Sequence, residues 1–188
     1  LNQYILLLAP TGTGKESMST GIDRLMASVK KSVIAAGEFV GPSEIASGQA
    51  LVRYMDKTSK CFVSLFDEFG HRLQAMANPK AHNAELVLQR KLLEVYQKSG
   101  RGQEWQPSVY ADAEKNTKII PCPAMSILGY CTPEKLYAEL NEEMITDGLL
   151  PRFSIIEYNG QRPETNHNHA YVQPAPDLTS QLAAICAH

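Results

Sequence analysis

The chain has 188 residues, 44% of them hydrophobic and 20% charged, and its formal net charge is −2. These values indicate a globular protein long enough for one domain with a sizeable core. The weak net charge excludes a general basic field that would hold the protein on nucleic acid or on an anionic membrane, so any contact with DNA must be local. No run reaches the roughly 18 apolar residues of a membrane span. The four cysteines lack metal-binding spacing, which favours a reduced, cytoplasmic protein without membrane contact.

The first motif is a glycine-rich turn between an apolar strand and a helix. Residues 3–9 predict a strand buried on both faces, and the apolar spacing over 15–31 predicts a helix. Glycines let successive N–H groups point at one anion, and the following helix adds its positive end. We therefore predict a phosphate-binding loop, in which Lys15 reaches the outer phosphates of a nucleotide. Its candidate nucleotide-binding residues are Pro10, Thr11, Gly12, Thr13, Gly14, Lys15, Glu16 and Ser17.

The loop departs from the usual motif at two positions. Ala9 replaces the first glycine, which costs little if the residue has a negative φ. Glu16 replaces the Ser or Thr whose hydroxyl normally ligates Mg²⁺. Ser17 follows one residue late, about 100° further round the helix, and is the alternative metal ligand. A chance glycine turn without a ligand is the competing interpretation.

A second apolar strand ends in two carboxylates. A short strand at 33–36 and a helix at 43–59, with Ser43 as its N-cap, precede it. Residues 61–68 then read as a mostly buried strand that finishes with Asp67 and Glu68. After a phosphate-binding loop, such a pair predicts an Asp that holds Mg²⁺ and a Glu that accepts a proton from the attacking water. The alternative is that Asp67 caps the next helix and Glu68 is solvated.

The rest of the chain continues the alternation of strands and helices. The pattern predicts helices at 69–77, 83–98 and 133–140, hairpin arms at 105–110 and 117–120, strands at 124–130 and 153–158, and a helix or turn at 142–150. This alternation predicts a mainly parallel sheet covered on both faces, in an α/β/α sandwich. Residues 1–158 form the expected domain and 159–188 a linker with a short helix at 177–187. We expect the chain to be a piece of a longer protein.

Four segments in this order resemble a known family. They are Ala-Pro-Thr-Gly-Thr-Gly-Lys at 9–15, Ser-Gly-Gln-Ala-Leu at 47–51, Leu-Phe-Asp-Glu-Phe-Gly at 65–70 and Gly-Leu-Leu-Pro-Arg-Phe at 148–153. Over about residues 3–158 the chain is similar to the motor domain of phage- and prophage-encoded primase–helicase-like proteins, which are P-loop NTPases. The resemblance implies a RecA/AAA-like fold and ATP hydrolysis with Mg²⁺. It also implies a homo-oligomeric ring that acts on single-stranded or double-stranded DNA.

The resemblance assigns roles to two further residues. Similar proteins position the attacking water with a polar residue at the end of the next core strand, which is Thr132 here, with Ser126 as the second choice. Thr132 could equally be an ordinary helix N-cap before Pro133. Arg152 matches an arginine finger that acts on a neighbouring subunit's nucleotide. A surface ion pair is the alternative for Arg152.

In superfamily 3 helicases, a hairpin between the Asp-Glu strand and the next core strand reaches DNA. In this chain the same interval contains the hairpin predicted within 105–120. By that resemblance Lys115, Lys118 and Arg101 would contact phosphates, and Trp105 or Tyr110 would stack on bases. An edge hairpin with a solvated tip is the simpler interpretation.

Two functions of different class remain open on the sequence. The first is an ATPase motor for DNA replication or unwinding. The second is a nucleotide-binding module with weak or no hydrolysis, because the carboxylate of Glu16 would repel phosphates unless Mg²⁺ or a basic partner offsets it. A small-molecule kinase is less favoured, since no Arg-rich lid segment follows. The base of the nucleotide is not predicted.

Overall fold

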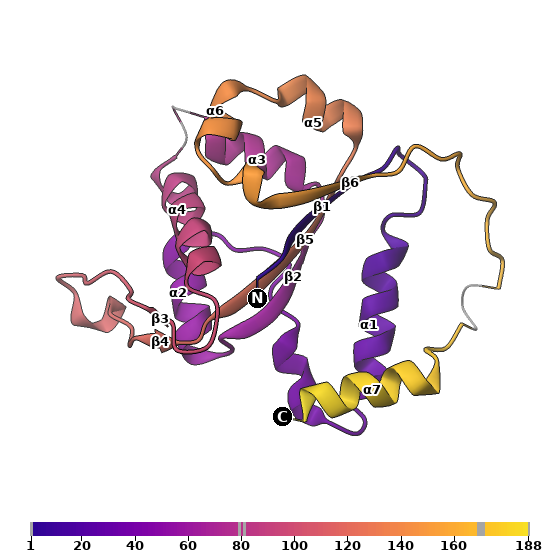
Figure 1. Cartoon of the computed structure of the whole chain (residues 1–188), viewed down its shortest axis with the longest axis horizontal. Helices are drawn as coiled ribbons and strands as arrows, with labels where there is room; N and C mark the ends of the chain where they lie inside the picture. Colours follow the sequence, from indigo (N-terminus) through magenta and orange to yellow (C-terminus); the bar gives the residue numbers. More distant parts are fainter. Residues whose placement is uncertain (1, 79, 81, 169–171, 188) are drawn as a thin grey trace.

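The computed structural model describes residues 2–78, 80, 82–168 and 172–187. Strands and helices alternate along most of the chain (Figure 1). The elements are β1 (Tyr4–Leu8), α1 (Ser17–Val29), η1 (Ile34–Phe39), α2 (Gly48–Lys57), β2 (Cys61–Phe66), α3 (Phe69–Ala77), α4 (Asn83–Gln97), β3 (Glu104–Trp105), η2 (Ala113–Lys115), β4 (Ile120–Pro121), β5 (Ala124–Cys131), α5 (Pro133–Glu139), α6 (Glu142–Thr146), η3 (Leu150–Arg152), β6 (Phe153–Glu157) and α7 (Pro176–Cys186).

Four strands form a parallel sheet in the order β2-β5-β1-β6. In register, Leu8 at the end of β1 pairs with Cys131 of β5 and Glu157 of β6, and Phe66 of β2 pairs with Gly129. The predicted mainly parallel sheet is therefore confirmed. Because all four strands run the same way, their carboxyl ends meet at one edge, where ligands of such sheets bind.

One face of the sheet carries most of the hydrophobic core. Figure 1 shows α2, α3, α4, α5 and α6 on this side. Alternate strand residues point into it, as the period of two requires. The strands contribute Tyr4, Leu6, Leu8, Phe62, Phe66, Met125, Ile127 and Phe153, and the helices contribute Leu51, Met55, Leu73, Leu88, Leu92 and Val95. The amide of Asn2 ties this face together: its nitrogen donates to the carbonyl of Val95 at 2.8 Å, and its oxygen accepts from the N–H of Met125 at 2.8 Å.

The opposite face is only partly covered, which corrects the expectation of two covered faces. Figure 1 shows α1 and α7 on this side. Val63 of β2 is 43% exposed and Ile156 of β6 is 52% exposed. The helices here make a small core of their own, formed by Met26, Val29, Ala36 and Cys186. The C-terminal helix expected at 177–187 is α7, and it packs on α1 and η1.

Three local predictions were wrong. Residues 33–36 do not form a strand: most of them fall in the 3₁₀ helix η1, and a single parallel bridge joins Val40 to Val63 instead. The helix expected from residue 43 begins at Gly48, because Ser47 is its N-cap and accepts the N–H of Ala50 at 3.2 Å. The hairpin arms are two residues each, β3 and β4, rather than long strands. In the part of the chain that the structure describes, no helix combines the length and the apolarity needed to cross a membrane.

Candidate functional site

The glycine-rich turn lies directly after β1, and its backbone is held by its own glycines and hydrogen bonds. Gly12 has φ +79° and Gly14 has φ +84°, values that side chains rarely adopt, so both positions require glycine. Thr13 closes the turn through its hydroxyl, which donates to the carbonyl of Pro10 at 2.8 Å. Among the described residues, the N–H groups of Gly14, Lys15 and Glu16 have no acceptor. Such unpaired N–H groups beside residues of positive φ form a concave anion-binding backbone.

The helix that follows begins two residues later than predicted. Glu16 is the N-cap of α1, but its side chain caps no N–H group. Ser17 turns back toward the loop, because its N–H donates to the carbonyl of Gly14 at 2.8 Å. A Cβ placed on Gly14 would lie 3.6 Å from the Ser17 hydroxyl oxygen. The alternative metal ligand therefore lies beside the loop.

The two carboxylates lie at the same edge of the sheet, where β2 ends. One strand, β5, separates β2 from β1, so the strand ends are about 10 Å apart at the usual spacing. Glu68 has φ +46° and ψ +36°, the left-handed region. This conformation costs about 1–2 kcal/mol in a residue with a side chain, and strain of this kind clusters at functional sites.

The side chains of the pair already have partners. Asp67 accepts the N–H of Glu68 at 2.9 Å. The Glu68 carboxylate lies 3.5 Å from the ammonium of Lys135 on α5 and 4.0 Å from the imidazole of His71. The Glu68 side chain is 64% exposed, so these are solvent-screened pairs that a ligand can displace at small cost. Neither Lys135 nor His71 was predicted to interact with Glu68.

The strand connections make the edge between β1 and β5 a switch point. After β1 the chain goes to α1 on the thinly covered face, and after β5 it goes to α5 on the packed face (Figure 1). In parallel sheets ligands bind in the crevice where successive connections diverge in this way. Cys131, the last residue of β5, is close enough to Gly70 of α3 and to Lys15 of the loop for both to affect its thiol. Burial raises the pKa of its thiol, while the N–H of Gly70 and the nearby charge of Lys15 act in the opposite direction.

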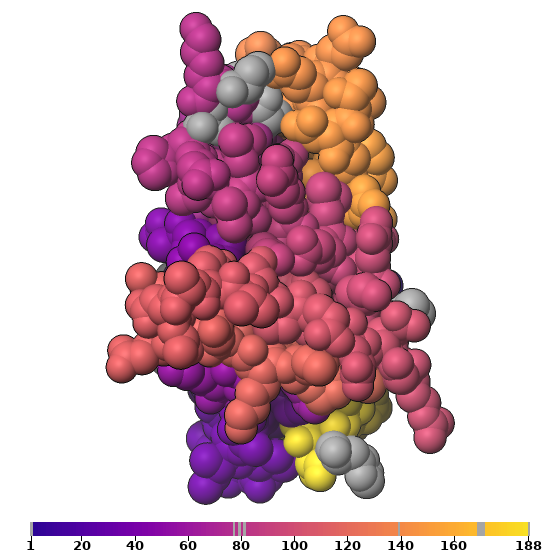
Figure 2. All heavy atoms as spheres, turned by 90° about the vertical axis from the view of Figure 1, so that its left-hand side faces the viewer, coloured from indigo at the N-terminus to yellow at the C-terminus, as the bar shows by residue number. Residues whose placement is uncertain are grey.

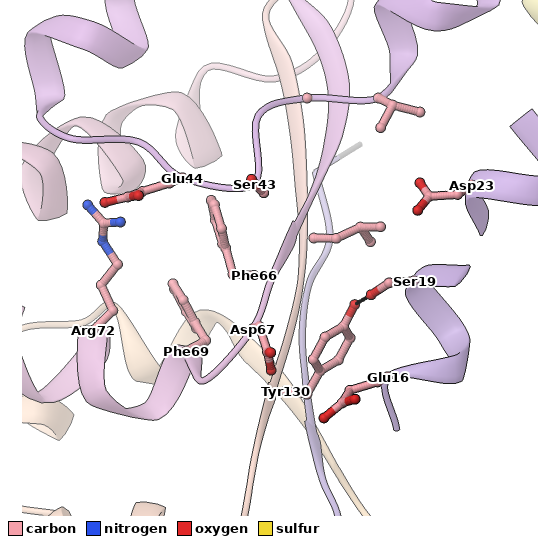
Figure 3. Close-up of a pocket in the computed structure, with 13 residues that line it drawn as sticks. Glu16, Ser19, Asp23, Ser43, Glu44, Phe66, Asp67, Phe69, Arg72 and Tyr130 are labelled. Atoms are coloured by element: carbon pink, nitrogen blue, oxygen red, sulfur yellow. Dashed lines mark hydrogen bonds between the residues drawn. The ribbon is translucent and has the colours of Figure 1, made fainter. Parts of the chain in front are cut away.

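A cavity of about 750 Å³ lies between α1 and the ends of β2 and β5. Figure 3 shows Ser19 and Asp23 of α1, with the N-cap residue Glu16, facing Asp67 and Tyr130 across it. The Ser19 hydroxyl and the Tyr130 hydroxyl share a hydrogen bond that links α1 to β5. Four carboxylates line this space, those of Glu16, Asp23, Glu44 and Asp67, against the single guanidinium of Arg72. The cavity is thus acidic and suits a cation or a cation-bound ligand.

Magnesium would be held mainly by the nucleotide itself. Among the described residues there is no group of three or more His, Cys, Asp or Glu side chains that could hold a metal. Mg²⁺ usually takes one or two carboxylates together with substrate phosphates and water. Asp67, with Ser17 or Glu16 as the second ligand, satisfies that pattern.

Thr132 lies at the carboxyl end of β5, as predicted. It has the N-cap position of α5 with Pro133 at the first helical position, yet its hydroxyl caps no N–H group. The Thr132 hydroxyl is therefore not used to cap the helix. Ser126 lies near the amino end of β5, where its hydroxyl accepts the N–H of Gln3 at 3.2 Å. Ser126 is too far along the strand to serve the site.

Arg152 lies at the opposite edge of the sheet from the loop. It precedes β6, whose first residue, Phe153, pairs with Tyr4 at the start of β1. The Arg152 guanidinium donates to the carbonyl of Gly148 and sits 5.7 Å from the centre of the Tyr96 ring. Within its own chain Arg152 contacts no part of the loop.

The hairpin also lies at the amino edge of the sheet. Figure 2 shows the segment between β3 and β4 spread over the surface beside α4. Trp105 is 1% exposed and donates its indole N–H to Glu94 at 2.9 Å, so its ring is not free to stack on a base. Lys115 pairs with Asp112 at 3.0 Å, whereas Lys118 and Arg101 are exposed. Lys115 and Lys118 belong to the segment between β3 and β4, and Arg101 follows α4, so none of them is part of the glycine-rich loop.

Comparisons of the chain with models of protein families, with curated proteins and with solved structures found no match. The case for a function therefore rests on the residues and their arrangement.

Proposed function

We propose that the chain is an ATP-binding, Mg²⁺-dependent ATP-hydrolysing domain. One observation carries the proposal: the glycine-rich loop, with its unpaired N–H groups and Lys15, shares one sheet edge with Asp67 and Glu68. The loop would bind the phosphates, with the ammonium of Lys15 on the β- and γ-phosphates. Asp67 would hold Mg²⁺, which neutralises charge on the phosphates.

Glu68 is the proposed general base. Its backbone strain keeps the carboxylate at the start of α3, beyond the strand end, where an attacking water would stand. Its pairs with Lys135 and His71 are exposed to solvent, so a ligand can displace them at small cost. Thr132 would hold the same water through its uncommitted hydroxyl.

The wider assignment follows the resemblance of the motifs. We propose a P-loop NTPase fold of the RecA/AAA type, working in the cytoplasm as the motor of a phage-type DNA replication or helicase protein. The strand order supports this fold, because the Asp-Glu strand is separated from the loop strand by one strand, β5, and the polar residue Thr132 directly follows β5. Arg152, on the far edge of the sheet, could act only on a neighbour's nucleotide in a ring. Lys118 and Arg101 are the proposed DNA contacts.

Steady-state ATPase activity with and without single-stranded DNA tests the proposal. We expect Mg²⁺-dependent turnover, stimulated by DNA. Lys15→Ala should weaken ATP binding about 100-fold, because hydrogen bonds to charged groups contribute about 1.5–3 kcal/mol each. Glu68→Gln should bind ATP normally and lose about 10²–10⁴-fold in kcat. Equal turnover by the Glu68→Gln and parent proteins would remove the base assignment, and activity indifferent to DNA would leave an ATPase without the motor role.

A nucleotide-binding module without turnover is the second candidate. The acidic cavity favours it, because Glu16 and Asp67 line the same space and would repel phosphates that lack a cation. ATP binding without measurable hydrolysis, unchanged in Glu68→Gln, would support this alternative.

A further inference from the structure

An arginine from the linker after β6 lies against the glycine-rich loop. The residue is Arg162. A Cβ placed on Gly12 would lie 3.4 Å from both Cζ and Nε of this side chain, and 3.6 Å from its Cδ. The guanidinium therefore covers the backbone of the loop at Gly12. Arg162 belongs to no sequence motif, and it lies beside the loop only because of the path that the folded chain takes.

The chain reaches this position by an extension of the sheet. The N–H of Tyr158, just beyond β6, donates to the carbonyl of Leu8 at 2.8 Å, directly before the loop. The Tyr158 hydroxyl then donates to the carbonyl of Gln161 at 3.1 Å, which bends the segment over the loop. Pro163 follows and restricts Arg162 to extended backbone. Figure 1 shows this segment running beside the turn that follows β1.

In the part of the chain that the structure describes, no salt bridge uses the charge of Arg162, and the side chain is exposed. Beside the loop, the carboxylates of Glu16 and Asp67 line one cavity. A triphosphate brings several more negative charges. An unpaired guanidinium presents a planar set of donors that suits phosphate oxygens.

We propose that Arg162 is a second phosphate-binding cation of this site, supplied by the same chain, and that it offsets the carboxylate of Glu16. The inference rests on the proposed nucleotide site and adds to it a binding residue outside the loop. It also gives the linker a function: the segment 158–163 becomes one wall of the site, and the triphosphate ties it to the loop.

The test measures binding of ATP, of inorganic tripolyphosphate and of adenosine by calorimetry, each with Mg²⁺. Arg162→Gln should lower the affinity for ATP and for tripolyphosphate about 10-fold each, and it should leave any binding of adenosine unchanged. Arg162→Lys keeps the charge but loses the planar donors, so it should weaken both by about 3-fold. Arg53→Gln, which removes an exposed arginine of α2, is the matched control and should change neither.

The outcomes separate this inference from the function on which it rests. If the parent protein binds ATP, Lys15→Ala does not, and Arg162→Gln binds as tightly as the parent, the phosphate site stands and the role of Arg162 is wrong. If Arg162→Gln weakens ATP but not tripolyphosphate, the side chain contacts the base or sugar, and the phosphate assignment is wrong. If the parent binds neither ATP nor tripolyphosphate, the proposed function and this inference both fail.

Discussion

The two faces of the sheet differ in how they are held, and the proposed site lies between them. On one face five helices join the strands in a core of many fully buried side chains. On the other, α1, η1 and α7 bury only four residues together, and a cavity of about 750 Å³ separates α1 from the strand ends. The difference indicates that the first face supplies most of the hydrophobic stabilisation, because this contribution grows with the apolar area that is buried.

The site takes its residues from both faces. Asp67 and Glu68 lead into α3 on the packed face, whereas Lys15, Glu16 and Ser17 lead into α1 on the thin face. A hydrogen bond between the hydroxyls of Ser19 and Tyr130 links α1 to β5. Regions with few buried contacts open at lower free energy than the core. We therefore expect the proposed catalytic pair to be rigid and the proposed phosphate-binding loop to be the more adjustable part of the site.

The largest expected contrast comes from removing the same side-chain atoms on each face. Val95 of α4 and Val29 of α1 are both 0% exposed. Val95→Ala should lower the free energy of unfolding by about 2–3 kcal/mol, because a cavity in a large core cannot collapse. Val29→Ala should cost about 1 kcal/mol, since the small core around it can close. Urea denaturation followed by circular dichroism measures both.

The pair is its own control, because the chemical change and the burial are identical. Equal losses in the two variants would mean that the thin face is as well packed as the other. A larger loss for Val29→Ala would reverse the comparison.

A smaller contrast is expected between two buried cysteines, whose rates of reaction with a thiol reagent should differ about 10-fold. Cys131 packs against Gly70 on the packed face, and Cys186 of α7 belongs to the small core. Cys61 and Cys122 are exposed and should react at once with a thiol reagent. Cys186 should then react about 10-fold faster than Cys131, because opening the thin face costs less free energy. Peptide mapping by mass spectrometry follows each site, and simultaneous labelling of both would indicate one cooperative unit instead.

The sequence predicted the parts of the structure that have local signals. Three elements have a clear apolar pattern of their own: the strand before the loop, the strand before Asp67 and Glu68, and the helix of Asn83–Gln97. The structure contains all three, with ends within two residues of the predicted ones. Asp67 and Glu68 follow β2 instead of ending it. The glycines predicted to turn the loop have positive φ at Gly12 and Gly14. Parallel strands then bring the loop and the carboxylates to one edge by geometry alone.

The parts that were missed depend on contacts between distant residues. Trp105 looked available for stacking, but Glu94 on α4 accepts its N–H and the ring is buried. The incomplete cover of one face cannot be read from strands whose two faces are similarly apolar. Arg162 and Lys135 reach the site from segments with no motif, and only the folded path of the chain shows it.

The smallest expected effect concerns the strained residue at the boundary of the two faces. Glu68→Asn should raise the free energy of unfolding by about 1 kcal/mol, because Asn tolerates the left-handed conformation that Glu68 has at φ +46°. The lost pair with Lys135 is exposed and offsets little of this gain. Glu68→Gln is the control, since it removes the charge but keeps the strain, and its stability should stay within about 0.5 kcal/mol of the parent. Both variants should lose hydrolysis. If the Asn variant is no more stable than the Gln variant, the backbone at residue 68 is not strained in solution, and strain no longer supports the choice of Glu68 as the base.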